Sequence, residues 1–113
     1  MAHYAELDTQ NRVLRVVVID NQYDTNEATG IAYCQQLFKG GIWIKTSYNS
    51  TIRKNFAVPG STYHADKDAF ITPRPFKSWQ LNSDYKWIAP LAYPTDGKAY
   101  YWHEGTLNWR EDL

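Results

Sequence analysis

The three histidines and their acidic neighbours are the first residues to test for chemistry, and they are His3, His64 and His103. They lie far apart, and none has the short spacing of a pair of metal ligands. Asp66 and Asp68 follow His64 closely, but zinc needs about four ligands and calcium six to eight oxygens. Lys67 stands between the two carboxylates, so the segment is typical of a polar turn. We expect neither a metal nor another cofactor.

Nucleophilic catalysis has one candidate sulfur, Cys34, the only cysteine. It falls on the apolar side of an expected helix, where a buried thiol is inert. The glycine-rich motifs of nucleotide sites and the nucleophile motif GxSxG are absent from the sequence. Nothing singles out one pair among the 12 acidic residues as paired catalytic carboxylates. We therefore expect a protein that is not an enzyme.

Charge counts against a dedicated nucleic-acid binder, because 12 basic residues balance 12 acidic ones. The charges are nevertheless unevenly distributed. Residues 1–30 hold five acids and two bases, whereas residues 31–60 hold four bases and no acid. Either the two faces pair within the fold, or they are complementary faces of neighbouring copies. In the second case, Arg53 and Lys54 are the charged contacts that we expect at an interface.

Two elements are expected to begin the fold. Residues 3–7 and 12–20 flank a short polar break and predict two strands joined by a turn. Residues 13–19 are apolar at almost every position, which predicts the central strand of the sheet, covered on both faces. Neither a secretory leader nor an apolar run of membrane-spanning length is recognisable, so we expect a soluble protein without membrane association.

The middle of the chain changes its spacing. Apolar residues recur at helical intervals from 26 to 38, with Asn26 as N-cap and Gly40 and Gly41 as the stop. Gly30 lowers the helix propensity of this stretch. Residues 42–48 have the composition of a strand, and residues 52–56 either pair with it or run as an extended loop.

Residues 61–113 hold 11 of the 18 aromatic residues and repeat one plan three times. In each segment two aromatic residues flank a polar turn, at residues 63–70, 79–87 and 102–109, which predicts three short hairpins. Proline-rich connectors separate them. The fold class expected is α+β and mainly β: a body of small antiparallel sheet plus helix over residues 1–60, followed by the hairpin half at 61–113, packed on the body as one domain.

Four tryptophans of this half leave three interpretations open. They form its core, a stacking platform for sugar rings, or the anchors of a protein interface, where Trp and Tyr dominate the binding energy. An isolated hairpin is marginal in water, so this half needs a surface to rest on. The aromatic residues that we expect to dock are Tyr63, Phe70, Trp79, Trp87, Trp102 and Trp109.

Seven segments of the chain look familiar together, at residues 1–8, 16–19, 45–49, 53–55, 68–76, 78–82 and 100–104. In this order they resemble a group of small virion-associated proteins of tailed phages, chiefly those of marine and cyanobacterial hosts. The resemblance runs over nearly the whole chain and departs from the usual pattern in being shorter between Asn49 and Arg53. It implies a virion component but no catalytic residues.

The function expected is therefore that of a phage structural or accessory protein, present in the virion in several copies. Its partners would be the major capsid protein or tail and baseplate proteins. Decoration of the capsid is favoured over a tail position, because a small neutral domain suits a clamp between capsomers. The alternative is a glycan-binding module on a tail appendage that touches the host surface, and a third reading is a host-modulating cytoplasmic protein.

Overall fold

A computed structural model describes all residues from 1 to 113. The fold is mainly β with one α-helix, and its strands form small antiparallel sheets. This confirms the fold class expected from the sequence. The chain divides into two compact units, Met1–Pro73 (unit 1) and Arg74–Leu113 (unit 2). The first aromatic hairpin thus groups with the N-terminal elements, and the boundary between the two units follows Pro73.

Unit 1 is built on a three-stranded sheet of order β2–β1–β3, with β1 at Ala2–Leu7, β2 at Val13–Ile19 and β3 at Ile42–Thr46. Both neighbours run antiparallel to β1, and a bulge interrupts its pairing with β2. The turn between β1 and β2 closes because the Asp8 carboxylate accepts the backbone N–H groups of Gln10 and Arg12.

The prediction that residues 13–19 form the central strand is wrong. The central strand is β1, whose Tyr4 and Ala5 are fully buried, whereas β2 lies at an edge with Leu14 and Val18 about half exposed. The apolar content of β2 suggested two covered faces, but it does not report the order of the strands. The polar residues of β1, His3 and Glu6, occupy positions that are only partly buried.

The single helix, α1 at Glu27–Leu37, confirms the predicted helix and its N-cap. The Asn26 side chain accepts the Thr29 N–H, and the Thr29 hydroxyl accepts the Asn26 N–H, which satisfies two of the free donors of the first turn. The left-handed turn after the helix begins at Lys39 (φ 60°) and continues through both glycines. A short 3₁₀ turn, η1 at Asn21–Tyr23, precedes the helix.

Glycine is required in α1 at residue 30, because the helix crosses the ring of Tyr4 there. A Cβ at this position would lie 2.0 Å from Tyr4 Oη and 2.3 Å from Cζ. The tight crossing brings the helix onto one face of the sheet, where Tyr4, Cys34 and Trp43 share a buried cluster. Gly30, which lowers the helix propensity of this segment, is thus the residue that allows the helix to pack on the sheet.

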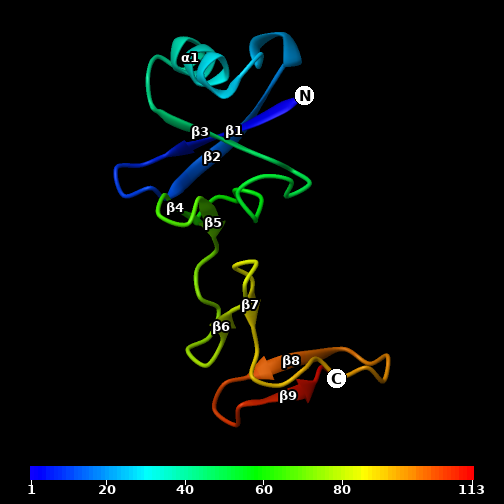
Figure 1. The fold of residues 1–113 in the computed structure, drawn as a ribbon. Helices are drawn as coiled ribbons and strands as arrows, with labels where there is room; N and C mark the ends of the chain where they lie inside the picture. Colours follow the sequence, from blue (N-terminus) through cyan, green and yellow to red (C-terminus); the bar gives the residue numbers. More distant parts are fainter. The chain divides into compact units, whose positions relative to one another are not determined.

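The opposite face of the sheet is covered by the first aromatic hairpin, β4 at Thr62–His64 and β5 at Ala69–Ile71. Figure 1 shows α1 and this hairpin on opposite sides of β1–β3. Phe70 is fully buried in a second cluster with Ala5 and Val13. Residues 52–55 form bends, with Arg53 and Lys54 at positive φ, so this segment neither pairs with β3 nor runs as an extended loop.

Unit 2 contains the two other predicted hairpins. The first pairs β6 (Gln80–Leu81) with β7 (Trp87–Ile88), and the second pairs β8 (Tyr100–His103) with β9 (Asn108–Glu111). The proline-bearing connector at 89–94 has no regular structure, as its composition predicts. No helix in the structure has the length and apolar character that a membrane crossing requires.

Candidate functional site

Five aromatic side chains of unit 2 gather in one cluster, called the aromatic cluster below: Phe76, Trp79, Tyr93, Trp102 and Trp109. Trp102 and Trp109 are direct cross-strand partners in the β8–β9 hairpin, with ring centroids 5.2 Å apart. Trp79 meets both at about 6 Å, at 82° and 65° to their planes. Edge-to-face packing of this kind stabilises beyond the area buried.

Glu104 ties the cluster together from the tip of the β8–β9 hairpin. Its carboxylate accepts hydrogen bonds from Trp102 Nε1 at 2.8 Å and from the hydroxyl and backbone N–H of Ser78, at 2.7 and 3.0 Å. The bond from Trp102, followed by those from Ser78, lowers the pKa of Glu104 below its usual value. The charged carboxylate therefore holds the segment that carries Trp79 against the hairpin.

The connector after β7 is fixed to the same hairpin. Trp109 Nε1 donates to the carbonyl of Leu91 at 2.9 Å, and the backbone N–H of Tyr100 donates to the Tyr93 hydroxyl at 2.9 Å. The Tyr100 hydroxyl in turn donates to Asp96 at 2.6 Å, and this hydrogen bond raises the pKa of Tyr100 to about 12. Trp109 and Tyr93 thus act as hydrogen-bonded anchors as well as apolar contacts.

The indole nitrogen of Trp79 is the exception, since it is buried and has no hydrogen-bond partner. An unpaired buried donor costs about 1–3 kcal/mol. This cost falls on a unit with little buried apolar surface, because Trp102, at 6% exposed, is its only buried apolar residue. Five apolar side chains of unit 2 are about half exposed and are together called the apolar rim below: Ile88, Leu91, Tyr93, Tyr101 and Leu107.

The structure brings together three of the predicted docking tryptophans, Trp79, Trp102 and Trp109, and leaves the fourth outside their cluster. Trp87 stacks instead under the guanidinium of Arg74, whose central carbon lies 5.2 Å from the ring centroid. Tyr63 and Phe70 pack on each other at 5.2 Å within unit 1, where Phe70 is fully buried. Phe70 is therefore a core residue of unit 1.

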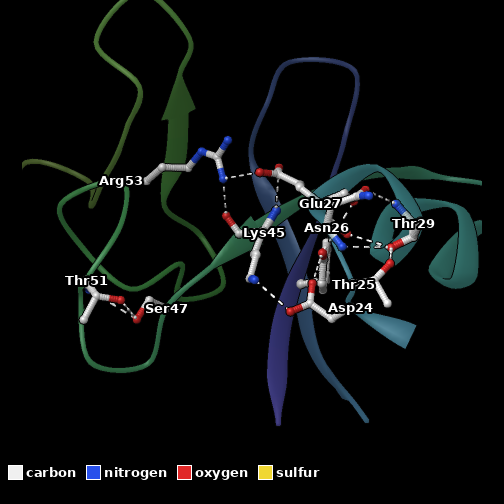
Figure 2. Close-up of polar contacts among 10 residues, drawn as sticks. Asp24, Thr25, Asn26, Glu27, Thr29, Lys45, Ser47, Thr51 and Arg53 are labelled. Carbon is white, nitrogen blue, oxygen red and sulfur yellow. Dashed lines mark hydrogen bonds and ion pairs between the residues drawn. The ribbon is translucent and has the colours of Figure 1, made fainter. Parts of the chain in front are cut away.

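Arg53 lies at the centre of a polar network in unit 1 rather than on an open surface. Its side chain is 16% exposed and forms ion pairs with Glu27 at 3.0 Å and Asp68 at 2.9 Å. It also donates to the carbonyl of Lys45 at 2.9 Å, while the Lys45 N–H donates to Glu27 at 3.2 Å. Figure 2 shows the contacts among Arg53, Glu27 and Lys45. Lys54, the neighbouring predicted contact, is exposed.

Asp24 forms a second part of this network, and the sequence did not single it out as a site residue. Its carboxylate accepts from the Tyr4 hydroxyl at 2.5 Å and from Lys45 Nζ at 2.8 Å. Burial alone would raise the pKa of Asp24, but the bonds from Lys45 and Tyr4 outweigh burial and lower it. Burial and the same bond to Asp24 raise the pKa of Tyr4.

An open pocket of about 460 Å³ lies beside this network, between the start of β1 and the segment after β3. On its wall, Asp24 is paired with Lys45, Glu27 is paired with Arg53 of the network, and the hydroxyls of Ser47 and Thr51 pair at 2.7 Å. No group of three or more potential metal ligands occurs in the structure. The network therefore fastens helix, strand and loop together, and its charged groups are engaged within unit 1.

Comparison with known proteins adds no relative: no family model, no curated protein and no solved structure matches the chain.

Proposed function

We propose that this protein is a structural or accessory component of a phage particle, present in several copies, and that the apolar rim of unit 2 docks on a neighbouring virion protein. The supporting observation is the thin core of unit 2: two short hairpins, one buried apolar residue and five half-exposed apolar side chains. Units of about 40 residues rarely bury enough surface to be stable unaided. A partner surface would complete the core.

The chemistry of the rim fits a protein partner. The rim consists of tyrosine, leucine and isoleucine side chains of the same unit as the tryptophan cluster, and aromatic residues are enriched at protein interfaces. The Arg53 network is occupied within unit 1, so we assign the docking role to unit 2 rather than to the basic middle of the chain. Among virion positions, decoration of the capsid is favoured, and a tail or baseplate position is the alternative.

The test is quantitative mass spectrometry of purified, washed particles. Hundreds of copies per particle would support capsid decoration, and a small multiple of three or six would support a tail position. Absence from washed particles would contradict the proposal and favour a protein that acts inside the host cell.

Variants of the rim test the docking surface itself. Tyr101→Lys and Leu107→Lys, which replace half-exposed side chains, should reduce incorporation into particles without unfolding the protein. Leu37→Lys on α1, equally exposed at 54%, is the matched control and should be incorporated normally. A glycan array with the wild type, Trp87→Ala and Trp109→Ala separates the sugar-binding alternative, which predicts binding that both substitutions abolish.

A further inference from the structure

The open pocket of unit 1 has both an aromatic and a polar lining. Its volume is about 460 Å³, within the range of small-molecule sites. The segment after β3 contributes Tyr48 and Asn49 to its wall, whereas η1 and the residue that follows it contribute Asn21 and Asp24. Side chains from separate segments thus converge on one hollow, as they do in a binding site.

Tyr48 supplies an aromatic surface that is exposed and yet held in place. The side chain is 70% exposed. His3 stacks on its ring with centroids 5.9 Å apart, and Phe56 meets the ring edge-on at 5.5 Å. The loop that carries it is closed at its base, because Ser47 Oγ also accepts the N–H of Thr51 at 3.2 Å. A surface that is ordered in advance loses little conformational entropy when a ligand binds.

The charged side chains of the wall already have partners. Asp24 pairs with Lys45 at 2.8 Å, and Glu27 pairs with Arg53 at 3.0 Å. Figure 2 shows both pairs. An ionic ligand would have to compete with these pairs, whereas a neutral ligand can leave them intact. The pocket therefore suits a neutral molecule.

Two side-chain amides of the wall remain available for such a molecule. Asn21 and Asn49 are exposed, and their amides make no hydrogen bond within the chain. A side-chain amide both donates and accepts, and so does a hydroxyl group. The two amides beside an exposed aromatic ring therefore match a ligand that carries several hydroxyl groups and also has an apolar face.

We propose that this pocket binds a neutral saccharide, with the C–H face of one sugar ring on Tyr48 and the ring hydroxyls bonded to Asn21 and Asn49. The face of an aromatic ring is negative, which favours contact with the C–H groups of a sugar. The inference goes beyond the proposed function: the site lies in unit 1, and the docking of unit 2 does not depend on it.

The test is saturation-transfer-difference NMR of the full chain with the methyl glycosides of glucose, galactose, mannose and N-acetylglucosamine. Transfer to the C–H protons of at least one sugar is expected. Tyr48→Ala should lower the affinity about tenfold, and Tyr48→Phe, which keeps the ring, should lower it much less. Asn49→Ala should also weaken binding. Leu14→Ala, 55% exposed on β2 and outside the pocket, is the control and should bind normally.

Three results would overturn the proposal, once circular dichroism has shown that the variants are folded. They are the absence of transfer to all of these sugars at millimolar concentration, binding that Tyr48→Ala leaves unchanged, and tighter binding of methyl glucuronide than of methyl glucoside. Sugar binding is measured on the free chain and docking by incorporation into particles, so failure of one proposal is distinguishable from failure of the other. Tyr48→Ala should be incorporated normally.

Discussion

Glu104 accepts three hydrogen bonds in unit 2, and its charge has a direct consequence for pH. Because the folded state lowers the pKa of Glu104, its stabilising contribution is complete above its ordinary value of 4.5 and is lost as the pH falls through the lower folded value. On acidification the near-UV circular dichroism of the tryptophans should therefore decrease. Glu104→Gln, which cannot ionise, should remove this step from the titration, and an unchanged titration would contradict the assignment.

Arg53 is the residue for which sequence and structure point to different roles. The sequence predicted a charged contact to a neighbour, whereas its guanidinium is occupied by Glu27, Asp68 and the Lys45 carbonyl. Arg53→Ala should lower the free energy of unfolding by about 1.5–3 kcal/mol, since it removes hydrogen bonds to charged groups in a partly buried site. Lys54→Ala, at the adjacent exposed position, should cost clearly less. Urea denaturation of the two variants makes the comparison, and equal losses would argue against the network.

The reactivity of Cys34 tests the prediction that its buried thiol is inert. It is fully buried, and burial raises the pKa of the thiol, so the reactive thiolate is scarce in the folded protein. A thiol-specific chromogenic reagent should react slowly under native conditions and rapidly in denaturant. Rapid reaction of the native protein would show that α1 does not stay docked on the sheet.

At the scale of the elements, α1 owes its position to the absence of a side chain at residue 30. Helix propensity alone predicts that Gly30→Ala stabilises by about 1 kcal/mol. The contact with Tyr4 predicts the opposite, because overpacking of a filled core costs about 1–3 kcal/mol. We expect a net loss of stability in thermal denaturation. Ala32→Gly, at an exposed helix position, should lose about 1 kcal/mol from propensity alone, and a stabilised Gly30→Ala variant would refute the close crossing.

The type and place of each element can be predicted from local sequence, whereas the elements that lie beside it in the fold cannot. The Asn26 cap, the glycines after α1 and the aromatic-flanked turns are signals contained within a few residues, and the structure places a helix and three hairpins there. Strand order depends on contacts between distant residues. For that reason the apolar β2 was mistaken for the central strand.

In the candidate site, contacts within one hairpin could likewise be predicted from the sequence, whereas contacts between distant segments could not. Trp102 and Trp109 are partners across one turn, so their contact could be predicted from spacing. Trp79 joins them from another hairpin, held by a glutamate 26 residues away from Ser78, which no local pattern indicates. Asp24 and Lys45, 21 residues apart, could not be paired from the sequence for the same reason.

At the scale of the whole molecule, the two units differ in how many apolar side chains they bury. Unit 1 has two buried clusters, one on each face of its sheet, and an ion pair between Arg53 and Glu27 beside β3. Unit 2 has a single buried tryptophan and an apolar rim. Its amides should therefore exchange with deuterium faster than those of β1–β3 in the free chain, because fewer apolar contacts oppose local opening. Equal protection of the two units would mean that unit 2 needs no partner.

Hydroxyl-radical footprinting tests the docking of unit 2 most directly, by comparing the free protein with the protein in purified phage particles. Tyr93, Tyr101 and Leu107 should be strongly labelled in the free chain and markedly protected in the particle, while Leu37 on α1 is labelled similarly in both. Equal labelling of the three rim residues in the two states would contradict the docking of unit 2.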